Sequence, residues 1–256
     1  MAYVGFSNVV LYMDKKINMN IQTFKNKKIV WFNIRESRSL TKRYKDSFLR
    51  MDNFFMKEKV SHTIEVDLSI DEDQILNGMD KGTKYEVRRC LKENLVIENI
   101  NEISTFIEFY NHFAKIKNLN LISKDNLNFS PDLILRGIKN IENQFLSIHV
   151  YVVNESGAIA RLLYSATNIE LFDDNKALIG RANRLLHYDD MLYFKSNGYK
   201  RYDLGGYAHN TEDKLLKGIN KFKKGFGGSV REVYIYEPII INVLKNLYGK
   251  VSPASR

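Results

Sequence analysis

The chain has 256 residues, enough for one large domain or two small ones, and 44 % of them are hydrophobic, enough for a packed core. Its single cysteine, Cys90, excludes an internal disulfide, and no apolar run approaches the ~20 residues of a membrane span. The first residues lack the basic and apolar regions of a secretion signal, so we expect a cytoplasmic protein.

The formal net charge of +9 suits an anionic partner, such as a nucleotide, coenzyme A, a nucleic acid or an acidic membrane face. The lysines are scattered rather than grouped in blocks, so a solvated basic surface explains the charge equally well. Charge alone therefore leaves both interpretations open.

Residues 1–60 are expected to belong to the same globule as the rest of the chain. Short apolar stretches at 9–13 and 28–34 are typical of strands. Over residues 36–59, large apolar side chains recur at steps of three and four, which predicts a helix.

The next part of the chain alternates strands and helices. Residues 62–68 predict a strand, and Ser69 with Glu72 predicts a capping box that begins a helix over 71–79. A strongly basic helix is expected over 83–94, a strand over 96–100 and an amphipathic helix over 103–117. A further helix is expected over 133–141, because proline at position 131 favours a helix start.

From residue 145 the pattern changes. Residues 145–153 and 158–167 flank the turn Asn154-Glu155-Ser156-Gly157 and predict a hairpin. A helix over 184–196, a strand over 199–204, a helix or loop over 214–224, a strand over 230–236 and a helix over 239–248 follow, and the tail 249–256 is expected to be loose. This order predicts one α/β domain with a mixed sheet over residues 61–248.

Several common chemistries have no signature here. The five histidines lack the close spacing of metal ligands, so we expect no metal site. Neither a P-loop nor a dinucleotide-binding glycine pattern occurs, and no G-x-S-x-G element indicates a serine hydrolase.

Three segments share a pattern with one known family. Residues 79–93, MDKGTKYEVRRCLKE, resemble the basic helix T-R-x-x-I-R-x-A of the FemABX-like acyl- and aminoacyltransferases, with matches at Thr83, Arg88 and Arg89. Lys84 stands where the family usually has arginine, and Cys90 where it usually has alanine.

The other two segments lie in the last third of the chain. Leu185-Leu186 and the later run 202–206, YDLGG, are similar to the family's L-L-W and Y-D-F-G-G elements. Residues 218–228, GINKFKKGFGG, resemble G-L-x-x-F-K-x-x-F-G-G. Order and spacing agree over about residues 60–236.

The resemblance, of the acetyltransferase-6 type, implies an α/β GNAT-like fold: a mixed, mostly antiparallel sheet flanked by helices. Full-length family members carry two such domains, and here only about 60 residues precede the matching region. We therefore expect a single main domain with a short N-terminal addition. The usual peptidoglycan-precursor substrate is then in question, because the first domain supplies part of that site.

The chemistry implied is attack of an amine on an activated acyl carbon. Lys223 matches the family's F-K lysine and is a candidate for stabilising the oxyanion or the donor phosphates, although it could be merely solvated. Asp203 could orient the amine or take its proton, or else cap a turn. His209 is a candidate base, or simply an exposed loop histidine.

Donor and acceptor contacts complete the expected site. The residues before the predicted helix 184–196 would offer free amides to a coenzyme pyrophosphate, or form an ordinary turn: Gly180, Arg181, Ala182, Asn183 and Arg184. Lys84 and Arg88 share a helix face at i, i+4 and could bind an acceptor phosphate, or be a solvated basic face. The other candidate substrate residues are Tyr202, Tyr207 and His149, of which His149 could simply belong to the sheet.

Three functions remain open. The first is an N-acyltransferase that uses acyl-CoA, such as acetyl-CoA, on an amino sugar or amino acid in cell-surface polysaccharide synthesis. The second is an aminoacyl-tRNA-dependent transferase of the peptidoglycan-bridge type, acting on a nucleotide- or lipid-linked amine. The third is a non-catalytic module that binds RNA or a membrane surface, which predicts no cleft behind Lys223.

Overall fold

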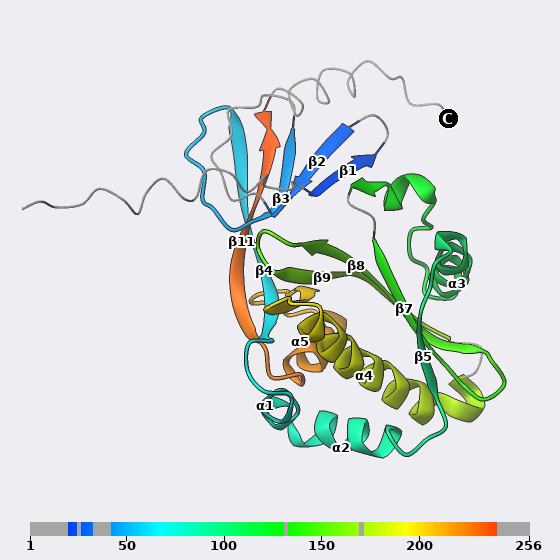
Figure 1. Cartoon of the computed structure of the whole chain (residues 1–256). Coiled ribbons are helices and arrows are strands. Elements are labelled where there is room, and N and C mark those ends of the chain that lie inside the picture. The colour runs from blue at the N-terminus through cyan, green and yellow to red at the C-terminus, as the bar shows by residue number, and fades with distance from the viewer. Residues whose placement is uncertain (1–19, 25–26, 33–41, 131–132, 169–171, 240–256) are drawn as a thin grey trace, which may run out of the picture.

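The computed structural model describes residues 20–24, 27–32, 42–130, 133–168 and 172–239, and these contain eleven strands in one sheet (Figure 1). The strand order is β5-β7-β8-β9-β10-β4-β11-β3-β2-β1-β6. The strands are β1 (Asn20–Phe24), β2 (Lys27–Trp31), β3 (Arg43–Ser47), β4 (Met56–Asp67), β5 (Val96–Asn99), β6 (Phe129–Ser130), β7 (Ile134–Lys139), β8 (Phe145–Asn154), β9 (Ile159–Thr167), β10 (Arg201–Gly206) and β11 (Ser229–Pro238).

The sheet is mixed and mostly antiparallel, as the resemblance implied. Only β2 with β3 and β9 with β10 pair in parallel among the described strands. The strands of the first 60 residues extend this same sheet, because β3 pairs with β11 and β2 pairs with β3.

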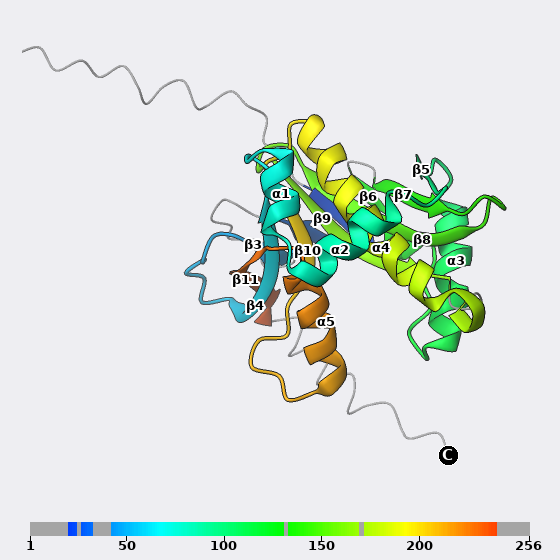
Figure 2. The ribbon, with the colours of Figure 1, turned by 90° about the horizontal axis from the view of Figure 1, so that it is seen from below.

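Helices cover both faces of the sheet. On one face lie α1 (Glu72–Gly78), α2 (Lys81–Cys90), α4 (Phe172–Ser196) and α5 (Lys214–Lys224) (Figures 1 and 2). On the other face α3 (Ile103–Ile116) packs through Phe106. Strand β8 divides its side chains between the two: Tyr151 joins the α4 cluster, and Val150 joins the α3 cluster.

Two predicted helices are wrong. In the described part of 36–59 the chain forms β3 and the start of β4, and the periodic apolar residues divide between a small core with Tyr44 and Met51 and a solvent-exposed tip. Residues 134–139 form β7 instead of a helix. This strand is buried on both faces, so it lacks the alternation that distinguishes a short strand from a helix.

Other boundaries moved. The capping box of α1 is formed by Asp71 and Gln74, not by Ser69 and Glu72. A short 3-10 turn, η2 (Lys124–Leu127), precedes β6. The predicted strand 9–13, nearly all of the predicted helix 239–248 and the tail 249–256 lie outside the described residues.

Candidate functional site

The parallel strands β9 and β10 pair only at their beginnings. Arg201, Tyr202 and Asp203 pair with Ile159, Ala160 and Arg161, and no further pair follows although β9 runs on to Thr167. Beyond Asp203, β10 stays with β4 and its register shifts before Gly206. The sheet therefore opens between the carboxyl halves of β9 and β10.

Gly205 shapes this opening. Its φ of 81° lies in the left-handed region, and a Cβ there would be 3.1 Å from the carbonyl oxygen of Leu162. A larger residue would thus be strained and would press on β9. Glycine at this position lets the two strands separate by a bulge rather than by a longer loop.

Lys223 of α5 lies at the opening. Its Nζ donates to the carbonyl oxygen of Gly206 at 2.7 Å. Burial, which has the largest effect, and Arg161 together lower the pKa of this lysine to about 8, while Asp203 acts in the opposite direction. A half-buried ammonium with this pKa can donate a hydrogen bond and can also exchange its proton near neutral pH.

Asp203 lies beside Lys223, and both of its carboxylate oxygens already accept hydrogen bonds from other groups. Arg161 Nη1 is 2.5 Å from Oδ2, and the amide of Gly205 donates to Oδ1 at 2.7 Å. The hydroxyl of Thr63 donates to Oδ1 as well. Since the carboxylate is buried and already has these donors, the geometry favours a positioning role over the proton acceptance that the sequence suggested.

Arg161 is a site residue that sequence reasoning missed. It is buried, its Nη1 contacts Asp203, and its Nε is 3.1 Å from Asp46 of β3. Asp46 has a φ of 49°, which is uncommon for a residue other than glycine. A lone arginine in the apolar strand AIARLLYSAT was the available signal, since a buried charge needs a partner.

The basic helix α2 meets the end of α5. The amide of Asp80 donates to the carbonyl oxygen of Gly225 at 2.9 Å, and the Asp80 side chain accepts from the amide of Thr83 at 2.6 Å. A Cβ at Gly225 would lie 2.5 Å from Thr83 Oγ1. Two segments with the family pattern therefore meet in one contact, the joint of Asp80 and Thr83 with Gly225. Beside this joint Lys84 is half-buried and Arg88 is exposed.

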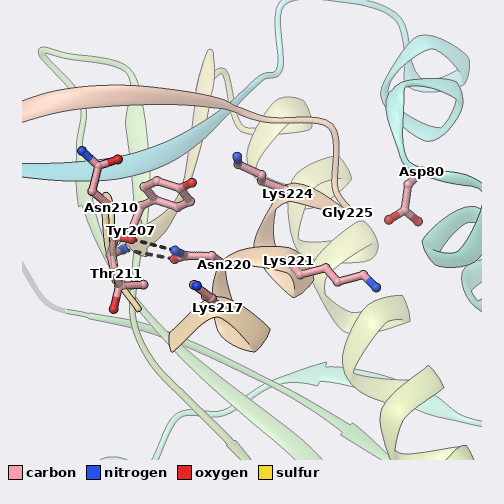
Figure 3. Close-up of a pocket in the computed structure, with 10 residues that line it drawn as sticks. Asp80, Tyr207, Asn210, Thr211, Lys217, Asn220, Lys221, Lys224 and Gly225 are labelled. Atoms are coloured by element: carbon pink, nitrogen blue, oxygen red, sulfur yellow. Dashed lines mark hydrogen bonds between the residues drawn. The ribbon is translucent and has the colours of Figure 1, made fainter. Parts of the chain in front are cut away.

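A cleft of about 560 Å³ lies between this joint and the segment that follows β10 (Figure 3). Asn220 fixes that segment, because its amide bonds both the nitrogen and the oxygen of Ala208 at 3.1 and 2.8 Å. The cleft is lined by Asp80, Tyr207, Ala208, Asn210, Thr211, Lys217, Asn220, Lys221, Lys224 and Gly225.

The charge of this cleft is mainly positive. Lys224 Nζ is 5.1 Å from the centre of the Tyr207 ring, and Lys221 is exposed without an ion pair in the described part of the chain. Lys217 pairs with Glu212 at 2.6 Å. Tyr207 follows Gly206, so the cleft adjoins the opening at Lys223.

Two predicted substrate residues are sealed in the core. His149 and Tyr202 have no exposed surface, so neither lines a substrate cleft. His149 lies 2.8 Å from Asp190 and 2.9 Å from Asn183, and Tyr202 lies 2.7 Å from both Tyr151 and His187. They form a buried polar network between the sheet and α4.

His209, the predicted base, is exposed and stacks on His62 with ring centres 4.3 Å apart. Its backbone amide donates to the carbonyl of Tyr207 at 3.1 Å. No described contact links its ring to Lys223.

The prediction that residues 180–184 precede a helix is wrong. Helix α4 begins at Phe172, so Gly180 and Ala182 lie inside it and their amides are not free for a pyrophosphate. Arg181 pairs with Glu93 at 2.7 Å, Arg184 donates to the carbonyl of Gly180, and Asn183 joins the buried network.

Other kinds of site find no support in the described ranges. They hold no group of three or more His, Cys, Asp or Glu placed to bind a metal ion. None of their helices is long and apolar enough to cross a bilayer.

Comparison with known proteins places the fold. No protein-family model matches the sequence, and no curated protein matches it. Among solved structures, FemX is 17 % identical with a TM-score of 0.59, over 73 % of this chain and 63 % of FemX. L-PGS from Bacillus licheniformis is 10 % identical with a TM-score of 0.54, over 91 % of this chain and 86 % of that one.

A GCN5-related N-acetyltransferase-like protein from Streptococcus suis also matches, at 11 % identity and a TM-score of 0.41, over 86 % of this chain and 82 % of that one. The fold is FemABX/GNAT-like, as the resemblance implied. The chain spans less than two thirds of FemX.

Proposed function

We propose that this protein transfers an acyl or aminoacyl group to an amine at the opening between β9 and β10. The observation that carries the proposal is Lys223, whose Nζ is held 2.7 Å from the carbonyl of Gly206 where the parallel strands part. An opening in a sheet gives an acyl donor access to backbone polar groups, and a partly desolvated cation beside it can stabilise developing negative charge.

In the proposed reaction a neutral amine attacks the acyl carbon, and the carbonyl oxygen becomes an oxyanion. Collapse of this intermediate re-forms the carbonyl and breaks the bond to the donor oxygen or sulfur. The tRNA hydroxyl or coenzyme A thiol then leaves with the proton that the amine loses, passed directly or through water. Protonated Lys223 would donate to this oxyanion, or to a donor phosphate beside it. Arg161 and Asp203 would hold the bulge and adjust the charge near Lys223.

For the donor, we favour aminoacyl-tRNA. The cleft next to Lys223 presents Lys221 and Lys224 beside the aromatic ring of Tyr207, a combination that suits phosphate and a nucleobase. The net charge of +9 would also attract a polyanion. An amine on a nucleotide- or lipid-linked precursor, or a free amino sugar, would be the acceptor.

Acyl-CoA is the second candidate, and one observation favours it. Helix α4 begins five residues after the end of β9, near the opened ends of the strands, where helix amides can hold a pyrophosphate.

Donor binding tests this choice. Fluorescently labelled, aminoacylated total tRNA should bind the wild type, and Lys221→Glu/Lys224→Glu should weaken that binding by roughly ten-fold, since it reverses two charges at the cleft. Lys115→Glu/Lys117→Glu, the same charge change on α3, is the control and should bind within a few-fold of the wild type.

Acetyl-CoA is the competing arm of the experiment. It should leave the melting temperature unchanged, because a ligand raises that temperature only by binding the folded state. A clear rise of the melting temperature with acetyl-CoA, together with equal tRNA binding by both double variants, would contradict the tRNA donor. The donor would then be a coenzyme A thioester, and the proposal of acyl transfer would stand.

A further inference from the structure

Two phenylalanines stand in solvent at the tip of the loop between β3 and β4. Phe54 is 89 % exposed and Phe55 is 60 % exposed, and their rings meet edge to face at 5.8 Å. The loop projects from the end of the sheet, at the left of the molecule in Figure 1. Such rings are normally buried, so an exposed pair at a projecting tip indicates a contact with something outside this chain.

The tip is a formed turn. Asn53 accepts from the amides of Phe55, through its side chain, and of Met56, through its carbonyl, both at 3.0 Å. The amide of Met51 donates to the Tyr236 hydroxyl at 2.7 Å, and Met51 and Met56 are buried on either side of the tip. The fold therefore holds both rings outward.

Cations follow the rings along β4. Lys57 and Lys59 point to the same side of β4, because side chains alternate with a period of two, and they follow directly after the turn that holds Phe54 and Phe55. Both lysines are exposed, and the described residues give them no ion pair. Arg50 adds a third cation, paired with Glu58, and Asp52 is the exposed acid of the loop.

We propose that this tip, Phe54 and Phe55 with Lys57 and Lys59, docks on a bilayer surface that contains anionic lipid. The two rings would enter the boundary between headgroups and acyl chains, where aromatic side chains are favoured. The lysines would then lie at the level of the lipid phosphates. A projecting apolar tip followed by unpaired cations suits this interface better than it suits a protein groove, which would have to supply both a deep apolar pocket and acids.

Vesicle co-sedimentation tests the proposal independently of any transferase activity. The wild type should sediment with vesicles of phosphatidylglycerol and phosphatidylcholine, and Phe54→Ser/Phe55→Ser should lower the bound fraction by about five-fold or more. Lys57→Glu/Lys59→Glu should also lower the bound fraction on these vesicles, and the loss should shrink as the salt concentration rises. The control is Leu119→Ser/Leu121→Ser, which changes two side chains that are 48 % and 54 % exposed after α3 and should bind like the wild type.

Two results would overturn the proposal. One is equal sedimentation of the wild type and of Phe54→Ser/Phe55→Ser, with or without anionic lipid. The other is a wild-type oligomer that this double variant converts to a monomer, in the absence of vesicle binding, which would make the tip a protein contact. Because both rings lie outside the core, circular dichroism should show all variants folded.

Discussion

At the scale of single residues, the proposed site is a group of charged side chains around Lys223: Arg161, Asp203 and Asp46. Arg161 and Asp203 face each other across the paired part of β9 and β10, and Asp46 of β3 contacts Arg161 from the N-terminal strands. Arg161 lowers the pKa of Lys223 and Asp203 raises it, while burial has the largest effect. The charge of the proposed catalytic lysine thus depends on two neighbours with opposite influence.

The two neighbours should therefore shift the pKa of Lys223 in opposite directions when each is replaced. Arg161→Gln should raise the pKa of Lys223 from about 8 toward the ordinary value of 10.5, and Asp203→Asn should lower it. Labelling with acetic anhydride over a pH series, quantified for the Lys223 peptide by mass spectrometry, measures the pKa because only the neutral amine reacts. Exposed Lys57 in the same digest reports reagent efficiency.

A shift of the Lys223 labelling curve in the same direction by both substitutions, or no shift by either, would contradict these opposite influences of Arg161 and Asp203 on its pKa. A loss of fold would be visible in the same experiment, because buried lysines across the chain would then label like Lys57. Such unfolding is distinct from a shift confined to Lys223.

At the scale of elements, glycines set how closely the site's segments approach. Gly227, between α5 and β11, has a φ of 82°, and a Cβ there would overlap the carbonyl oxygen of Gly78 at the end of α1. With the contact of Gly225 on Thr83, this position joins α5 to the helices before it. The glycines of the GFGG run therefore have a packing role, whichever ligand binds.

Gly227→Ala should consequently destabilise the fold by about 1–3 kcal/mol, through backbone strain and overlap with Gly78. The matched control is Gly78→Ala, the other side of the same contact, whose Cβ would meet nothing within 4 Å. Urea unfolding followed by circular dichroism gives both free energies. Equal stability of the two variants would contradict the proposed joint.

The elements also show what a sequence can predict here. The hairpin β8–β9 and helices α1 and α3 follow from local periodicity and turn residues and lie where expected, and α5 forms where either a helix or a loop was expected. β7 was missed because its pairing with β5, which is distant in sequence, and with the next strand, β8, decides that it is a strand. The early start of α4 was missed as well, and with it the expected pyrophosphate loop.

The same limit applies to the site. Lys223 could be proposed from the sequence because it lies within a short motif, whereas Arg161 and Asp46 come into contact only when β9 and β3 meet in the folded chain. His149 looked available in sequence, yet the sheet and α4 enclose it. Burial and the pairing of distant strands decide which residues reach the site, and no local sequence pattern encodes either of them.

At the scale of the molecule, one sheet carries both the strands of the first 60 residues and those of the rest of the described chain. The match to FemX covers 73 % of this chain, and the match to L-PGS covers 91 % of it. The described surface places a lysine cleft next to the opened strands, and two exposed phenylalanines at the tip before β4. Reaction, donor and docking surface can therefore be tested separately.

The most direct test of acyl transfer at Lys223 is product formation from labelled donors. The wild type is incubated with a radiolabelled pool of aminoacyl-tRNAs, or with labelled acetyl-CoA, and with a panel of amino sugars, amino acids and their nucleotide-linked forms. The measurement is the initial rate at which label enters an acid-stable amide. We predict product from the tRNA pool, at an unchanged rate for the control Lys214→Met at the exposed start of α5, and a rate at least about ten-fold lower for Lys223→Ala. Product formed by Lys223→Ala at the wild-type rate would contradict the central claim.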